Sequence, residues 1–87
     1  MRLEDLQVRP HFRGFMHQEL FENGYGISVV PEEDSEHYEV AVLEHLKGRK
    51  AHLTYDTEVT NDVIRWCTVS AVDALIERIK NLPIKGG

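Results

Sequence analysis

Two runs of alternating polar and apolar residues, Phe15 to Glu22 and Tyr25 to Val30, flank the dipeptide Asn23-Gly24. Alternation with a period of two is typical of a β-strand that has one buried face. A type I′ turn needs a positive φ at both central residues, and Asn-Gly meets this need at low steric cost. The pattern therefore predicts a β-hairpin with strands at residues 12–21 and 25–30.

A two-residue turn at Asn23-Gly24 also predicts how the two strands pair. Leu20 then lies opposite Ile27, and Phe21 lies opposite Gly26, where its ring covers the missing side chain. The core face is predicted to carry Met16, Leu20 and Ile27, and the second face Phe15, His17, Glu19 and Phe21.

The chain after the hairpin predicts two further strands. Pro31 ends the second strand because proline donates no ladder hydrogen bond, and residues 32–37 form a polar loop. The third strand, Tyr38 to His45, contains the apolar run Val40 to Leu43. Such a run indicates a central strand covered on both faces, or one whose second face meets a partner. A fourth strand is expected from Ala51 to Tyr55.

The period changes from two to 3.6 after Asp56. A short helical turn is expected near residues 61–66. Thr68 or Ser70 can cap a longer helix that runs to about Leu82, before Pro83. One apolar stripe lies along this helix: Val72, Leu75, Ile76, Ile79 and Leu82. We expect this stripe to cover the sheet, because one amphipathic helix is marginal alone.

The length of 87 residues predicts one domain. We expect the α+β class: a four-stranded antiparallel β-meander with a C-terminal α-helix packed on one face, in the order ββββα. Its parts are an irregular lead-in at residues 1–11, the meander at residues 12–56, a helical segment at residues 60–82 and a flexible tail at residues 83–87.

Charge is distributed unevenly along the chain, whose net charge is −5. No Lys or Arg occurs from Gly14 to Leu46, a stretch that holds eight acidic residues. Such a surface repels phosphate backbones, so we expect no direct nucleic-acid binding. The acidic stretch serves solubility or meets a basic protein partner.

Composition bears on location. The longest apolar run has four residues, too few to span a membrane, and no signal peptide is visible at the N-terminus. Cys67 is the only cysteine, which excludes an intramolecular disulfide and fits a reducing compartment. We therefore expect a cytoplasmic protein without a membrane partner.

No residue pattern predicts catalysis, a cofactor or a metal. The five histidines, His11, His17, His37, His45 and His52, lack the short spacings of zinc ligands. Cys67 is expected to be a small buried hydrophobe, and the loop acids lack apolar neighbours that would raise a pKa. Gly86-Gly87 is also the ending of ubiquitin-like and sulfur-carrier proteins. Their tail follows a final strand, so here we expect a flexible or cloning-derived terminus.

The second face of the hairpin is the candidate site. If the helix covers the other face, Phe15 and Phe21 stay partly exposed beside the acidic loop, as anchors with a charged rim. Alternatively, residues 1–11 fold across them, or a second copy covers them in a homodimer. The candidate partner-binding residues are Phe15, His17, Glu19, Phe21, Glu32, Glu33, Asp34 and Glu36.

Three segments, at residues 23–30, 38–43 and 55–64, resemble small proteins of unknown function encoded by tailed bacteriophages. The resemblance covers about residues 20–82, and its motifs are a hairpin turn, a central strand and a helix entry. It implies expression in the cytoplasm of an infected bacterium and transfers no catalytic residue.

These observations favour a non-enzymatic protein-interaction module. We expect it to bind a host or viral protein through the acidic hairpin and loop, as an inhibitor or a mimic of nucleic-acid charge. The alternative is a structural or virion-associated protein that self-assembles through strand edges or an uncovered sheet face. A small metal-binding protein or enzyme is the third class.

Overall fold

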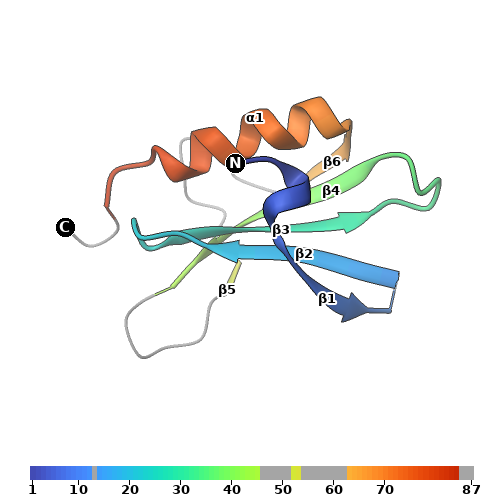
Figure 1. The fold of residues 1–87 in the computed structure, drawn as a ribbon, viewed down its shortest axis with the longest axis horizontal. Coiled ribbons are helices and arrows are strands. Elements are labelled where there is room, and N and C mark those ends of the chain that lie inside the picture. The colour runs from blue at the N-terminus through green and yellow to red at the C-terminus, as the bar shows by residue number, and fades with distance from the viewer. Residues whose placement is uncertain (13, 46–51, 54–62, 85–87) are drawn as a thin grey trace.

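The computed structural model describes residues 1–12, 14–45, 52–53 and 63–84. One α-helix lies across one face of an antiparallel β-sheet (Figure 1), which confirms the predicted α+β class and the C-terminal helix. The strands are β1 (Gln7–His11), β2 (Gly14–Leu20), β3 (Tyr25–Pro31), β4 (Tyr38–Glu44), β5 (His52–Leu53) and β6 (Ile64–Cys67), and the helices are the 3-10 turn η1 (Leu3–Asp5) and α1 (Val69–Lys80). The sheet order is β1-β2-β3-β4-β5, and β6 pairs with β4.

The described residues contain six strands rather than the four expected. The lead-in is not irregular throughout, because Gln7–His11 pairs with β2. Pro10 fits there because β1 is an edge strand, where a residue without an N–H can face away from the ladder. The helical turn expected near residues 61–66 is also wrong where it can be compared, since Ile64–Cys67 is a strand; residues 61–62 lie outside the described part.

The turn between β2 and β3 differs from the expected type I′ turn. Among its residues only Gly24 has a positive φ, of 89°. The Phe21 N–H donates to the Tyr25 oxygen at 2.7 Å, and the Gly24 N–H donates to the Phe21 oxygen at 3.3 Å. The loop therefore holds three residues, Glu22 to Gly24, in the geometry of a type I turn followed by a left-handed glycine.

One extra loop residue shifts the strand pairing by one position. Leu20 pairs with Gly26, and Glu19 pairs with Ile27. Because side chains alternate between faces, this shift moves every β2 side chain to the opposite side of the sheet from the one predicted. Phe21 consequently enters the core, whereas Leu20 is 45% exposed. Leu20, not Phe21, covers Gly26: a Cβ on that glycine would lie 2.8 Å from Leu20 Cδ2.

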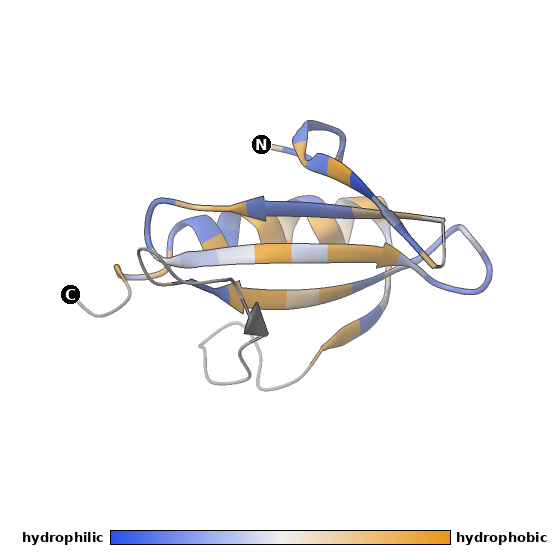
Figure 2. Cartoon of the chain, turned by 90° about the horizontal axis from the view of Figure 1, so that it is seen from below, coloured by the Kyte–Doolittle hydropathy of each residue, from blue (hydrophilic) through white to orange (hydrophobic). Residues whose placement is uncertain are grey.

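The core lies between α1 and the central strands. Hydrophobic residues are concentrated in β3 and β4, with the more hydrophilic β2 beside them (Figure 2). All four residues of the run Val40 to Leu43 are buried, as expected for a central strand covered on both faces. The core cluster consists of Leu3, Leu6, Phe21, Ile27, Val29, Val40, Val42, Cys67, Val72, Leu75, Ile76 and Ile79. Each fully buried aliphatic side chain stabilises the fold by roughly 1.5–3 kcal/mol.

Helix α1 begins at the predicted Thr68 cap and ends at Lys80, shortly before the predicted end near Leu82. Thr68 is the N-cap, since its hydroxyl accepts a hydrogen bond from the Ala71 N–H at 3.1 Å. At the other end the buried Asn23 side chain donates through Nδ2 to the carbonyl oxygens of Ile79 at 2.8 Å, Lys80 at 3.2 Å and Leu82 at 3.1 Å. A residue of the β2–β3 turn thus satisfies the orphan carbonyls at the C-terminus of α1.

The first residues of the chain are attached to α1. The Leu3 N–H donates to Asp73 Oδ1 at 2.8 Å, and the amino group of Met1 lies 3.2 Å from Glu77 Oε2. Leu3 is buried in the same core cluster as Phe21. Of the open alternatives for the two phenylalanines, the lead-in therefore helps to enclose Phe21 but leaves Phe15 at 61% exposure.

Candidate protein-interaction site

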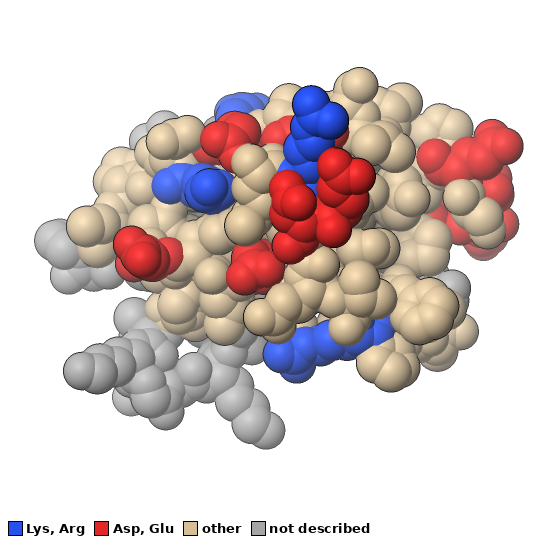
Figure 3. Space-filling model, viewed as in Figure 1, with Lys and Arg blue, Asp and Glu red and all other residues tan. Residues whose placement is uncertain are grey.

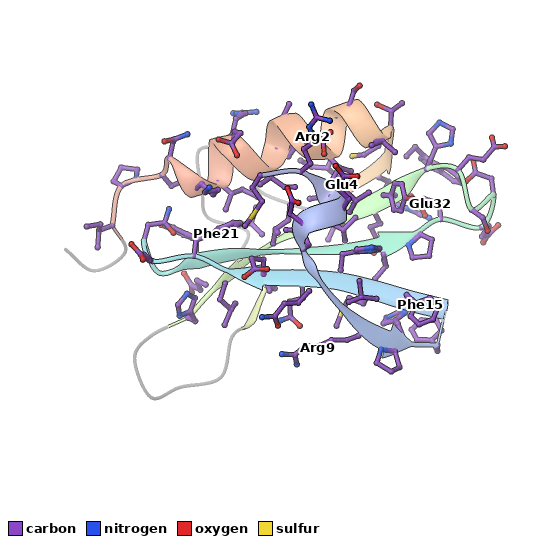
Figure 4. The ribbon with its side chains drawn as sticks, in the orientation of Figure 1. Arg2, Glu4, Arg9, Phe15, Phe21 and Glu32 are labelled. Atoms are coloured by element: carbon purple, nitrogen blue, oxygen red, sulfur yellow. The ribbon has the colours of Figure 1, made fainter. Side chains whose placement is uncertain are left out.

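The loop between β3 and β4 and the strand β6 meet at one end of the sheet. Tyr38, the first residue of β4, pairs with both Pro31 and Cys67, which end β3 and β6. We name this region the loop end and define it as residues 32–37 together with Arg65 and Trp66. Figure 4 shows Glu32 at this end of the molecule, opposite the end toward which Phe21 lies.

A buried carboxylate organises the loop end. The Glu32 side chain has no exposed surface. It accepts hydrogen bonds from Arg65 Nε at 3.1 Å, from the terminal nitrogen Nη2 of Arg65 at 2.8 Å and from the Trp66 backbone N–H at 3.0 Å. Charge-assisted bonds of this kind are about twice as strong as neutral ones and compensate the burial of the charge. Glu32 therefore holds the backbone of β6 in place through the Trp66 N–H. The expectation that Glu32 lies on the surface was wrong.

Trp66 has an uncommon backbone conformation. Its φ is 58°, in the left-handed region that bulky residues rarely adopt. The pairing of β4 with β6 is irregular here, because Arg65 and Trp66 both lie opposite Glu39. This is a β-bulge, a feature that redirects side chains and in which glycine normally takes the left-handed position. A tryptophan at this position is held by the bond from its N–H to Glu32.

Trp66 is half exposed, at 51% of its residue surface. The Arg65 guanidinium carbon lies 5.4 Å from the centre of the ring, and the His37 ring approaches edge-on at a centroid distance of 6.2 Å. Arg65 is also 3.4 Å from Glu39 Oε1, and hydrogen bonding to Glu32 raises its pKa. The ring is therefore oriented by two neighbours while much of its surface faces solvent.

Asp34 orders the acidic loop. Its Oδ1 accepts hydrogen bonds from the backbone N–H groups of Glu36 and His37, each at 3.0 Å, and its Oδ2 lies 2.6 Å from His37 Nδ1. These bonds stabilise the carboxylate and lower the pKa of Asp34, chiefly through the Glu36 N–H. Asp34 thus holds the loop in a hydrogen-bonded turn, from which the His37 ring contacts the Trp66 ring.

Acidic side chains gather at the loop end. Figure 3 shows them at the end of the molecule where the β3–β4 loop lies. Glu33, Asp34 and Glu36 are exposed, as expected for a charged rim. The exposed carboxylates therefore lie at the end of the molecule that holds the half-exposed Trp66, and not at the end toward which Phe21 lies.

The other predicted site residues lie elsewhere. His17 and Glu19 are half-buried on β2, on the side of the sheet that α1 covers. His17 lines a cavity of about 290 Å³ with Leu3 of η1 and Val69 of α1, and its buried Nδ1 has no hydrogen-bond partner. Burial lowers the pKa of His17. Phe21 is a core residue, which contradicts the expectation that its ring stays partly exposed.

A second exposed apolar surface is formed by the hairpin of β1 and β2. We name it the hairpin tip and define it as Phe12 and Phe15. Their exposed fractions are 87% and 61%. Phe12 stacks on His11 with ring centres 4.3 Å apart. Figure 4 shows Phe15 at the end of this hairpin, away from α1.

Two further expectations bear on chemistry. Cys67 is buried, as predicted, and burial raises the pKa of its thiol. Within the described ranges, no group of three or more His, Cys, Asp or Glu side chains is arranged to hold a metal ion. No helix among these residues is both long and apolar enough to cross a membrane.

The sequence did not point to Trp66 as a site residue, because residues 61–66 were predicted to form a helical turn. The available signal was the chain's single tryptophan between Arg65 and a cysteine, just before the Thr68 cap. A strand at this position would have exposed every second side chain. The bulge itself leaves no mark in the sequence, since it lacks the usual glycine.

The fold and the loop end together define a small α+β protein with a preformed aromatic and acidic surface. Comparisons with family models, with curated proteins and with solved structures gave no match to this chain.

Proposed function

We propose that the chain is a non-enzymatic protein-interaction module that binds another protein through the loop end. One observation carries this proposal: a half-exposed tryptophan is kept in a left-handed backbone conformation by a buried carboxylate. Tryptophan is enriched among the residues that dominate binding energy at protein interfaces. Packing of the core does not require a strained, half-exposed tryptophan, whereas binding of a partner through its ring would explain it.

The energetics of Trp66 support this reading. A left-handed conformation costs a non-glycine residue about 1–2 kcal/mol, and glycine would avoid the cost. Backbone strain of this kind clusters at functional sites, where surrounding structure over-determines it. Here the over-determining contact is the hydrogen bond to Glu32. About half of the residue remains exposed, so complete burial of the indole does not offset this cost.

The resemblance to phage proteins supports a host or viral protein as the partner, with binding in the bacterial cytoplasm. Inhibition of a nucleic-acid-binding protein by charge mimicry is the sharper version of the proposal. It is supported by the exposed carboxylates of Glu33, Asp34 and Glu36. Charge complementarity of this kind governs encounter and specificity.

Affinity capture with matched variants tests the proposal. The wild-type chain, Trp66→Ala and Glu22→Gln are immobilised and exposed to lysate of a bacterial host. Glu22 is a suitable control because it is an exposed acid in the turn at the other end of the sheet. We expect a protein that wild type and Glu22→Gln retain and Trp66→Ala loses. Equal retention by all three proteins would refute the role of the loop end.

Self-assembly is a second candidate function, and the hairpin tip favours it. Phe12 and Phe15 are among the most exposed aromatic residues, at 87% and 61%. Pro10 counts against pairing through the β1 edge, because it offers no N–H to a further strand. Assembly would therefore use the aromatic side chains rather than the strand edge.

Light scattering after size exclusion separates the two candidates. Self-assembly predicts a dimer or larger species that Phe12→Ser with Phe15→Ser converts to a monomer. A wild-type monomer at high concentration would eliminate self-assembly and leave the loop-end proposal intact.

A further inference from the structure

We propose that the loop end receives an arginine or lysine side chain from a basic segment of the partner, which lies against the open part of the Trp66 indole. This inference rests on the proposed function and names the chemistry of its partner. The occupant is a cationic peptide segment, as opposed to an apolar helix or an anionic ligand.

The first support is that a cation already lies against this ring. The Arg65 guanidinium carbon is 5.4 Å from the ring centre, within the range of a cation–π interaction. Arg65 is itself held by Glu32 at 2.8 Å and Glu39 at 3.4 Å. Its charge is therefore compensated inside the chain, and it covers one part of the indole of Trp66, a residue that remains 51% exposed.

The second support is the charge of the exposed carboxylates. Residues 32–39 hold five acidic residues, and Arg65 contacts two of them. The two carboxylates that contact Arg65 are the buried Glu32 and the half-buried Glu39. The exposed ones are Glu33, Asp34 and Glu36. Asp34 contacts His37, whose ring contacts Trp66, so negative charge lies one side chain away from the indole.

These two features exclude other occupants. An anionic segment would be repelled by the exposed carboxylates. An apolar helix would need a groove, whereas the surroundings of Trp66 are charged side chains of the loop and of Arg65. A cation placed over the indole is attracted both by the face of the ring and by the exposed carboxylates.

Trp66 is the only tryptophan, so its fluorescence reports directly on the site. The full chain is titrated with a hexa-arginine peptide, with hexalysine and with hexacitrulline, which keeps the shape of arginine without its charge. We expect saturable changes in emission with the two cationic peptides and none with hexacitrulline. Raising the salt from about 0.05 M to about 0.5 M should weaken the binding about tenfold, because exposed charges are screened.

Variants assign the interaction to residues by calorimetry. Asp34→Asn with Glu36→Gln should weaken hexa-arginine binding several-fold, and Trp66→Leu should weaken it about tenfold. Glu22→Gln should leave it unchanged, since its carboxylate is at the opposite end of the sheet. Binding that Trp66→Leu leaves intact, or equal binding of hexacitrulline, would overturn the inference.

The failures of the two proposals are distinguishable. If the cationic peptides do not bind but a cellular protein is still lost with Trp66→Ala, the interaction module stands and its cationic partner is refuted. If the peptides bind with the expected variant pattern and no protein depends on Trp66, the surface accepts cations but the proposed function is refuted.

Discussion

Two polar side chains are buried among the described residues, Asn23 at one end of the sheet and Glu32 at the other. Both satisfy backbone groups of a distant segment. Asn23 binds the last carbonyls of α1, 56 to 59 residues away in sequence. Glu32 binds Arg65 and the N–H of Trp66, 33 and 34 residues away.

The difference lies in what each contact stabilises. Asn23 completes a regular element, because helix carbonyls without partners must otherwise meet water. Glu32 instead supports a strained residue whose side chain is exposed. One end of the sheet is therefore closed onto the protein's own helix, and the other holds an aromatic ring toward solvent. Buried polar contacts of similar geometry thus serve stability at one end and, as proposed, binding at the other.

The largest effect is expected from Asn23→Ala. The substitution removes the side-chain donor shared by the carbonyls of Ile79, Lys80 and Leu82, of which the Ile79 oxygen keeps the Leu82 N–H. It also removes the acceptor of the Tyr25 N–H. We expect the free energy of unfolding to fall by about 2–4 kcal/mol, since each unsatisfied buried group costs about 1–3 kcal/mol. Urea denaturation measures this loss.

Asn81→Ala is the matched control for that experiment. Asn81 also donates to a helix carbonyl, that of Glu77, but it is exposed. Water can replace its bond, so the loss should stay below about 0.5 kcal/mol. Equal losses for the two variants would remove the distinction between buried and exposed caps.

A smaller loss, with a different signature, is expected from Glu32→Gln. The amide cannot accept on both sides, so part of the bonding to Arg65 is lost, and the free energy of unfolding should fall by about 1–3 kcal/mol. Trp66 should relax as well, which changes its fluorescence and near-ultraviolet circular dichroism at neutral pH. Asn23→Ala should leave both spectra of the folded protein unchanged. The same spectrum for Glu32→Gln and wild type would show that Glu32 does not position the indole.

A comparison of Trp66→Gly with Trp66→Ala isolates the strain. Alanine is normally the more stabilising residue outside special backbone positions. At a φ of 58° the order should reverse, and the glycine variant should be more stable by about 1 kcal/mol. Both variants lose the indole, so packing losses largely cancel in the difference. If alanine proves equally stable in urea denaturation, the backbone at this position is not strained.

The sequence was sufficient for the regular parts of the fold. Period-two alternation located β2 and β3, and the stripe from Val72 to Ile79 with the Thr68 cap located α1, because burial on one face imposes a periodicity. The continuous apolar run Val40 to Leu43 located β4, which is buried on both faces. The acidic rim at Glu33, Asp34 and Glu36 was also identified correctly as exposed, since a run of charges in a loop remains hydrated.

The errors have one physical origin: contacts between residues far apart in the sequence decided the local loop conformation and which side chains are buried. Asn-Gly suits both a two-residue and a three-residue loop. Here Asn23 adopts the geometry in which its side chain reaches the end of α1. That choice moved Phe21 into the core and Leu20 out of it. Likewise, Glu32 could not be recognised as buried before Arg65 was known to lie against it.

The smallest expected effect concerns pH at the loop end and depends on Asp34. The Glu36 N–H, followed by the His37 side chain, lowers the pKa of Asp34 below its ordinary value of about 3.9. A depressed carboxyl pKa contributes stability that is fully present above the unfolded value and is lost as the pH falls through the folded value. We therefore expect the loop end to be unchanged at neutral pH and to lose order only in acid, below about pH 4.

Carbon-detected NMR of the Asp34 carboxyl, folded and in urea, tests this expectation. The midpoint in the folded chain should be the lower of the two, and the emission of Trp66 should change in the same acid range, because His37 links Asp34 to the indole. Asp34→Asn should abolish the acid-induced change in emission. Core stability and the Asn23 contacts at the far end should be unaffected by this variant. A folded midpoint at or above the urea value would show that the loop bonds do not stabilise the carboxylate, and the order of the loop end would then rest on Glu32 alone.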